Sequence, residues 1–134
     1  MKLTSFSRNN VAGYGAVADG GIIDLTLAIE GASDLKSLLE ADGLAKAADY
    51  ALGRSADYAL EEIEFLPLIP NAPKVICVAV NYQAHAREAG RTIAEYPVLF
   101  HRHAQTQVGH RASLLVPKVS EQLDFEGEIA VVLG

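Results

Sequence analysis

The chain has 134 residues, of which half are hydrophobic and 21% are charged, and its formal net charge is -6 at pH 7. This composition is typical of a globular domain, and no apolar run reaches the ~20 residues that a membrane helix needs. The acidic balance argues against a nucleic-acid partner. The N-terminus lacks the apolar stretch of a secretory signal, and the single cysteine, Cys77, excludes an internal disulfide. We therefore expect a cytoplasmic protein that binds neither nucleic acid nor membranes.

Residues 1–66 are predicted to form a small N-terminal α/β domain. The runs LTSF and YGAVADGGIIDL are typical of strands, and Asp19-Gly20 is a hairpin turn signal. The segment SDLKSLLEA predicts a helix with Ser33 as its N-cap, and LAKAADYAL predicts a second helix that ends at Gly53. No combination of side chains in this domain is typical of a catalytic site.

Residues 67–73 are predicted to form a connector, because Pro67, Pro70 and Pro73 recur within the segment FLPLIPNAP. Proline fixes the backbone and blocks a helix, so this stretch is expected to be stiff and extended. We take it as a domain boundary, which assigns residues 74–134 to a second domain. A rigid loop inside a single domain is the alternative.

The second domain is predicted to be mostly β. KVICVAV is a continuous apolar run, which is typical of a strand buried on both faces. Asn81 is expected to cap a helix over YQAHAREA, and Gly90 is expected to end it. YPVLF and ASLLVP predict further short strands. The fold class predicted for the whole chain is therefore α+β, mostly β.

Three carboxylates occupy every second position of QLDFEGEIAVVLG, which spans residues 122–134. On a strand, Asp124, Glu126 and Glu128 would share one face, while the apolar residues take the other. Neighbouring acids on one face repel, and a divalent cation such as Mg²⁺ would relieve that repulsion. On spacing alone, an edge strand that keeps its acids in water is the simpler interpretation.

Two further groups of residues are candidates for chemistry. If YQAHAREA is helical, His85 and Glu88 are neighbours on one face, and a carboxylate beside an imidazole favours general-base catalysis. The alternative is a surface ion pair, which the spacing alone favours. In LFHRHAQTQVGHR, Arg102 could hold a substrate carboxylate through a bidentate pair of hydrogen bonds. The histidines of this segment are interpreted as surface or rim residues: His101, His103 and His110.

Three stretches, in this order, resemble the fumarylacetoacetate hydrolase family: PNAPKVICVAVNYQAHAREAG, PVLFHRHAQTQVG and VPKVSEQLDFEGEIAVVLG. The resemblance covers about Pro70 to Gly134. It implies the first part of a β-roll catalytic domain, preceded by a small N-terminal domain like that of the shorter bacterial members. It also implies a metal-dependent enzyme of aromatic catabolism. Such an enzyme would act on β-diketo acids or related oxo-diacids (acylpyruvates or 2-hydroxyhepta-2,4-diene-1,7-dioate, for example) as a hydrolase, decarboxylase or isomerase.

The resemblance also implies roles for individual residues. Glu126 and Glu128 would bind Mg²⁺ or Mn²⁺, and His85 paired with Glu88 would activate water. The substrate pocket, which takes a small anionic oxo acid, would be lined by Arg102, Tyr82 and Thr106. Thr106 stands where the family often has serine, and this departure leaves the identity of the oxo acid open.

Family members carry a further metal-binding Asp, and usually a Lys, well downstream of the two glutamates. The resemblance places these positions after Gly134, so we expect a fragment of a longer enzyme that is inactive on its own. We also expect the chain to form homo-oligomers, such as a homodimer, and to bind Mg²⁺ no tighter than roughly millimolar. The alternative is a non-catalytic binding or assembly module that keeps the family scaffold.

Overall fold

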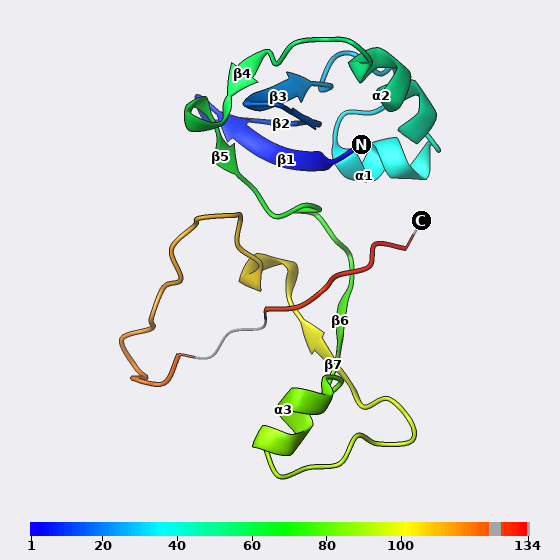
Figure 1. Cartoon of the computed structure of the whole chain (residues 1–134). Coiled ribbons are helices and arrows are strands. Elements are labelled where there is room, and N and C mark those ends of the chain that lie inside the picture. The colour runs from blue at the N-terminus through cyan, green and yellow to red at the C-terminus, as the bar shows by residue number, and fades with distance from the viewer. Residues whose placement is uncertain (124–126, 134) are drawn as a thin grey trace. The chain divides into compact units, whose positions relative to one another are not determined.

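A computed structural model of the chain describes residues 1–123 and 127–133 (Figure 1). It contains two compact units. The first comprises Met1–Ile69 together with Val108–Gly134, and the second comprises Pro70–Gln107. The break after Ile69 falls inside the predicted proline connector. The domain boundaries expected from the sequence, 1–66, 67–73 and 74–134, stay a prediction.

The first unit is built on a five-stranded antiparallel sheet in the order β4-β3-β2-β1-β5. Its two longest strands, β1 and β2, pair over six residues, and the predicted turn at Asp19-Gly20 joins β2 to β3. Gly20 has a φ of 83°, a conformation that glycine adopts without steric cost, so the hairpin prediction is confirmed. The strands are β1 Leu3–Arg8, β2 Val11–Ala18, β3 Gly21–Asp24, β4 Tyr58–Ala59 and β5 Glu64–Phe65.

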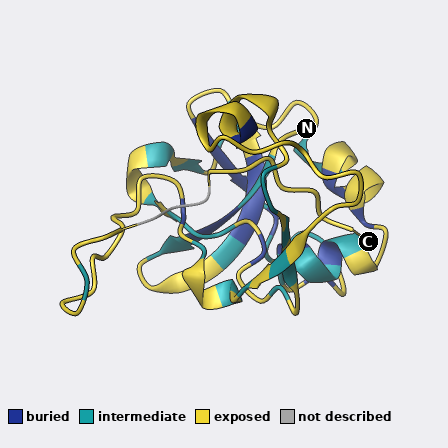
Figure 2. Cartoon of the chain, turned by 90° about the horizontal axis from the view of Figure 1, so that it is seen from below, coloured by how far each residue is buried: buried dark blue, intermediate teal, exposed yellow. Residues whose placement is uncertain are grey.

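The core of this unit lies between the sheet and two short helices. Figure 2 colours its buried residues dark blue, and Tyr14, Ile22 and Leu38 are among those fully buried. The hydroxyl of Tyr14 donates a hydrogen bond of 3.1 Å to the carbonyl oxygen of Ala32, and burial raises the pKa of this tyrosine. The sheet thus has a side packed on the core, as expected for an antiparallel sheet.

Helix α1, Leu35–Glu40, begins one residue later than the sequence predicted. Its N-cap is Asp34, not Ser33, because the Asp34 carboxylate accepts from the Ser37 N–H at 2.7 Å. The Ser37 hydroxyl oxygen in turn accepts from the Asp34 N–H at 3.0 Å, which completes a capping box. Helix α2, Leu44–Ala51, ends before Gly53 as predicted, and Gly53 has a φ of 71°.

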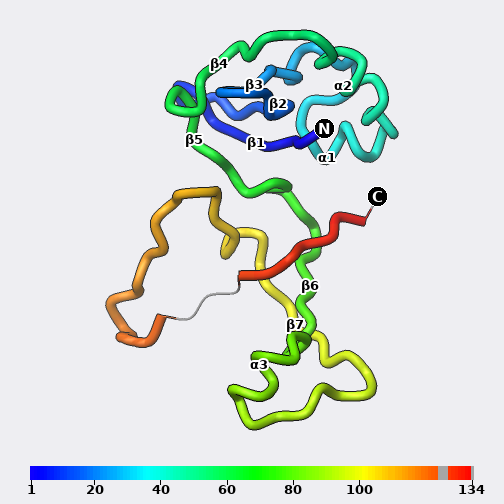
Figure 3. Tube along the Cα trace, viewed as in Figure 1, coloured from blue at the N-terminus to red at the C-terminus, as the bar shows by residue number. Residues whose placement is uncertain are grey.

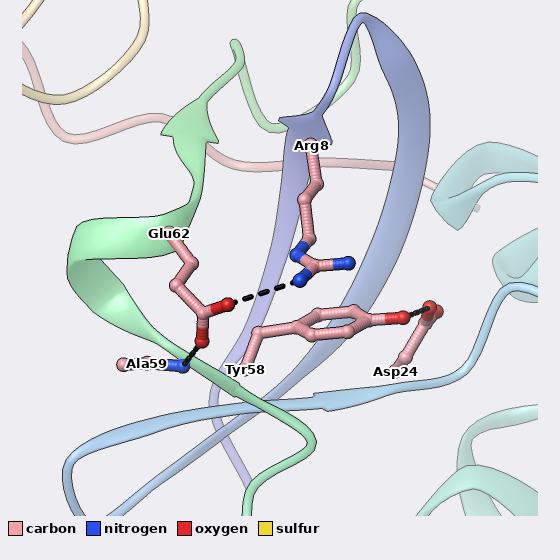
Figure 4. A network of polar contacts seen from close by, with 5 residues as sticks. All are labelled: Arg8, Asp24, Tyr58, Ala59 and Glu62. Carbon is pink, nitrogen blue, oxygen red and sulfur yellow. Dashed lines mark hydrogen bonds and ion pairs between the residues drawn. The ribbon is translucent and has the colours of Figure 1, made fainter.

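A chain of polar contacts joins β1, β3 and β4 with the turn η1 in this unit (Figure 4). Arg8 pairs with Glu62 of η1 (Leu60–Glu62) at 3.0 Å, and Glu62 also accepts from the Ala59 N–H at 2.9 Å. The Arg8 guanidinium lies 4.3 Å from the centre of the Tyr58 ring, whose hydroxyl donates to Asp24 at 3.1 Å. The Ala59 N–H and the Arg8 guanidinium hold the pKa of Glu62 below its usual range.

The second unit is a two-stranded antiparallel ribbon with one helix. Strand β6, Val75–Val78, pairs with β7, Leu99–Arg102, and the register places Val75 opposite Arg102. Helix α3, Gln83–Glu88, follows β6, and the turn η2, Ala104–Thr106, follows β7. The longest described helix is α2, and none has the length and apolarity of a membrane span.

The predicted burial of KVICVAV on both faces is wrong. Ile76 and Val78 are 54% and 38% exposed, while Val75 and Cys77, on the other face, are half-buried. A strand is buried on both faces only when it lies inside a sheet with a layer on each side. In the described part of the chain β6 has one strand neighbour, so one face stays open.

Two other strands predicted from the sequence are absent from the described residues. Residues 112–117 and 127–133 join neither of the two described sheets, and Figure 3 traces both as irregular chain. Ile129, Val131 and Leu133 are 83%, 79% and 90% exposed. An alternating pattern makes a strand only where a neighbouring strand accepts its backbone hydrogen bonds. The mixed α and β character, with more strand than helix, is confirmed.

Asp34→Ala is predicted to destabilise the first unit by about 1 kcal/mol, because it removes the side-chain cap of α1. Ser33→Ala, at the neighbouring position, is the matched control and should change the free energy of unfolding by less than about 0.5 kcal/mol. Urea unfolding of both variants followed by circular dichroism measures the difference. A larger loss in Ser33→Ala than in Asp34→Ala would contradict the assignment of the cap.

Glu62→Gln is predicted to lower stability at neutral pH but not in acid. A carboxyl whose folded pKa is depressed stabilises the fold above its unfolded pKa, near 4.5, and this contribution is lost as the pH falls through the folded pKa. Unfolding at neutral pH and at about pH 3 tests the prediction. Glu61→Gln is the control, because it removes the same charge at the neighbouring residue, for which no ion pair is described. The same pH dependence of stability in both variants would contradict the stabilising role of Glu62.

Candidate functional site

Helix α3 is positioned by the ribbon that precedes it. The N–H of Ala79 donates to the carbonyl of Val98 at 2.8 Å and so extends the β6–β7 ladder by one bond. Val80 then turns the chain with a φ of 53°, a conformation that is strained for a β-branched residue. Tyr82, not the predicted Asn81, is the N-cap, because its carbonyl accepts from the Ala86 N–H at 2.9 Å. Gly90, with a φ of 61°, ends the helix as predicted.

The helical setting predicted for His85 and Glu88 is confirmed, since both lie in Gln83–Glu88. Ala86, between them, is buried and holds the helix against its unit, whereas both candidate side chains are exposed. Residues three apart on a helix have Cβ atoms about 5–6 Å apart. The described contacts include no hydrogen bond or ion pair between the two side chains. A change of rotamer would be needed to bring the His85 imidazole and the Glu88 carboxylate into contact.

Arg102 lies at the end of β7 and lines an open depression with a volume of about 510 Å³. The side chain is half-buried and shares a ribbon face with Phe100, while His101 takes the opposite, exposed face. Side chains alternate along a strand, so His101 and Arg102 point away from each other. Lys74, His101 and His103 also line the depression, and no sequence pattern had pointed to Lys74.

Two other predicted pocket residues lie close by in the chain. Thr106 is exposed in η2, and its hydroxyl donates to the carbonyl of His103 at 2.8 Å. Tyr82 is 44% exposed at the start of α3. His110 belongs to the first unit, where its ring packs edge-on against Phe65 with centroids 5.3 Å apart. This contact makes His110 a packing residue of that unit.

Five of the seven predicted site residues fall in the second unit, Pro70–Gln107: Tyr82, His85, Glu88, Arg102 and Thr106. Among these, Arg102 is the residue that lines the depression. Glu128 belongs to the first unit and is exposed, and Glu126 lies outside the described residues.

The donor chemistry of the glutamate pair fits a hard divalent cation. Carboxylate oxygens are the protein ligands that Mg²⁺ prefers, usually one or two of them together with water. The exposed carboxylate of Glu128 has no hydrogen-bond or ion-pair partner in the described part of the chain, so it is accessible to an ion. Within residues 1–123 and 127–133, no three His, Cys, Asp or Glu side chains lie close enough together to hold a metal.

Comparison with curated proteins finds relatives in an archaeon and in mammals whose sequence identities to this chain are similar. An uncharacterized protein of Archaeoglobus fulgidus is 37% identical over 76 residues, which are 56% of this chain and 30% of that protein. The mitochondrial oxaloacetate tautomerase FAHD2A of Bos taurus is 36% identical over 73 residues, or 54% of this chain and 23% of that protein. Its human counterpart is 34% identical over the same shares.

Each match thus covers less than a third of the relative's own length. The sequence model for the C-terminal domain of fumarylacetoacetate (FAA) hydrolase matches residues 74–134, a segment that contains all seven predicted site residues. The match begins at Lys74, at the start of the ribbon that carries α3 and Arg102. Residues 74–134 thus match the fumarylacetoacetate hydrolase family.

Proposed function

We propose that this chain carries the acid–base pair, the substrate-binding arginine and metal ligands of a metal-dependent enzyme for oxo acids. The observation that carries the proposal is helix α3, which presents His85 and Glu88 one turn apart and exposed inside the family segment. Relatives named oxaloacetate tautomerases support the same class of chemistry. Hydrolysis, decarboxylation and isomerisation of oxo acids share an enolate formed from the keto group, and tautomerisation is the simplest of these reactions to test.

In this proposal His85 is the general base. Its imidazole takes a proton either from the carbon next to the keto group or from an attacking water, and returns it in the reverse step. The Glu88 carboxylate, one turn further along α3, orients the ring and fixes its tautomer when the two side chains pair. Exposure of both groups leaves them accessible to a substrate.

Arg102 binds a substrate carboxylate in the proposed complex. A guanidinium presents parallel N–H groups that match the two oxygens of a carboxylate, so the pair is directional as well as charged. Arg102 is half-buried, which restricts its side chain, and it opens onto the depression at the end of the ribbon. Tyr82 and Thr106 offer hydroxyl groups to the same substrate.

Glu126 and Glu128 are the proposed ligands for Mg²⁺ or Mn²⁺. When bound, such an ion supplies positive charge that stabilises an enolate oxygen. What the chain itself contributes is a pair of hard oxygen donors at alternate positions of the family segment.

His85→Ala is predicted to lower kcat for oxaloacetate tautomerisation by about 10²–10⁴, as expected for loss of a general base. The substitution is introduced into the gene in the native organism, and the variant protein is purified from that source. Stopped-flow absorbance then follows the loss of the enol form of oxaloacetate. Metal affinity should stay within about twofold, since His85 is not a proposed ligand. A parallel loss of metal affinity would make His85 a ligand or a structural residue instead. Gln83→Ala, on the same helix, is the matched control.

Glu128→Gln is predicted to weaken Mn²⁺ binding by about tenfold or more, because it removes a charged oxygen ligand. Electron paramagnetic resonance of free Mn²⁺ measures this with the 134-residue chain, and Glu126→Gln should behave alike. Glu61→Gln removes the same charge from the first unit and should leave the affinity unchanged. Equal Mn²⁺ affinity in the Glu128 and Glu61 variants would rule out the proposed ligands.

A further inference from the structure

Two histidines lie at alternate positions where strand β7 ends. His101 belongs to β7, and His103 follows Arg102 with an extended backbone, at a φ of -79° and a ψ of 145°. Exposed and half-buried positions alternate without a break from Leu99 to His103. Both histidines are therefore on the exposed face of the strand, and Arg102 is on the other face. The two imidazoles leave the ribbon on the same side.

The spacing of the two histidines suits two ligands of one metal ion. Residues two apart on an extended chain have Cα atoms about 6–7 Å apart. An imidazole carries its nitrogens well beyond Cβ, so two rings on one face at this separation can converge on a single ion. Both rings line the same depression, with a volume of about 510 Å³, and both are exposed. An ion can thus reach them directly from solvent.

The backbone of each histidine is held in place before any ion binds. His101 is opposite Ile76 in the β6–β7 ladder. The carbonyl of His103 accepts from the Thr106 N–H at 2.9 Å and from the Thr106 hydroxyl at 2.8 Å. Only the two side-chain rotamers remain to be fixed, and this lowers the entropic cost of binding.

The chemistry of these ligands selects a transition metal over Mg²⁺. Imidazole nitrogens suit Zn²⁺, Cu²⁺ and Ni²⁺, whereas Mg²⁺ requires oxygen ligands. The described residues that line the depression include no carboxylate. Lys74 also lines it, and the ammonium group repels any cation. One exposed like charge changes an affinity by only a few fold, so it weakens a site of two imidazoles without abolishing it.

We propose that His101 and His103 form a binding site for Zn²⁺, separate from the glutamate pair. Their imidazole nitrogens take two of the four tetrahedral positions of the ion, and water takes the other two. A site with only two protein ligands binds its ion reversibly. The inference does not rest on the proposed function, because neither histidine has a role in it.

The test titrates Zn²⁺ into the 134-residue chain at about pH 8 with Mg²⁺ in excess, while NMR follows the imidazole signals. Protons compete with the metal for imidazole, so this pH leaves the rings free to bind. The His101 and His103 signals should shift together and saturate at one Zn²⁺ per chain. His103→Gln should weaken this binding about tenfold or more, because it removes one of two ligands. The metal-free spectrum of the variant shows whether it is folded.

His85→Gln is the matched control, because it removes another exposed imidazole from the same unit at a position that is not among the described residues lining the depression. It should change the affinity of the His101–His103 site by less than about twofold. Lys74→Gln should tighten Zn²⁺ binding about two- to fivefold, since it removes the repelling charge. An equal loss in the His85 and His103 variants, or weaker Zn²⁺ binding in Lys74→Gln, would overturn the site.

Discussion

The pairing of β6 with β7 is the constraint on which the candidate site depends. Four backbone pairs, from Val75↔Arg102 to Val78↔Leu99, decide which side chains of each strand share a face. They place Arg102 at the ribbon end, beside the start of β6, and they fix the point from which the chain turns into α3. A two-stranded ribbon is marginally stable by itself, so the geometry of Pro70–Gln107 is sensitive to any change in this ladder.

The two units divide stability and chemistry between them. The first unit has a fully buried tyrosine, a capping box and a contact network from Arg8 to Asp24, all of which serve packing. The second unit has few buried side chains but carries most of the predicted site residues on exposed positions. It also holds the strained Val80, directly before α3. Backbone strain of about 1–3 kcal/mol is common at functional sites, where it sets the direction of a neighbouring element.

Local signals in the sequence predicted the turns and helix ends well. Gly20, Gly53 and Gly90 each adopt a positive φ where the sequence placed a turn or a helix end, because this requirement is set by the residue itself. The prediction of Ser33 as the N-cap of α1 was wrong by one residue, since serine and aspartate are both good caps. What decides it is the reciprocal bond with Ser37, three residues beyond Asp34.

Features that depend on distant partners could not be read from the sequence. The apolar run KVICVAV predicts a strand, but its burial depends on layers that are not encoded in the run itself. The alternation in residues 127–133 has no paired strand in the described sheets. Likewise His85 and Glu88 were found from their helical spacing, whereas Lys74 was missed. Its position next to the end of β7 follows from a cross-strand register in which Val75, the residue after Lys74, pairs with Arg102.

The most direct measurement of the central claim is proton exchange at the carbon next to the keto group of oxaloacetate. The protein isolated from its native source is incubated with oxaloacetate and Mg²⁺ in deuterated water, and NMR follows deuterium at that carbon. If the chain carries an acid–base pair for oxo-acid enolisation, exchange is faster than in buffer and proportional to protein concentration. Exchange at the buffer rate at every protein concentration would contradict the account.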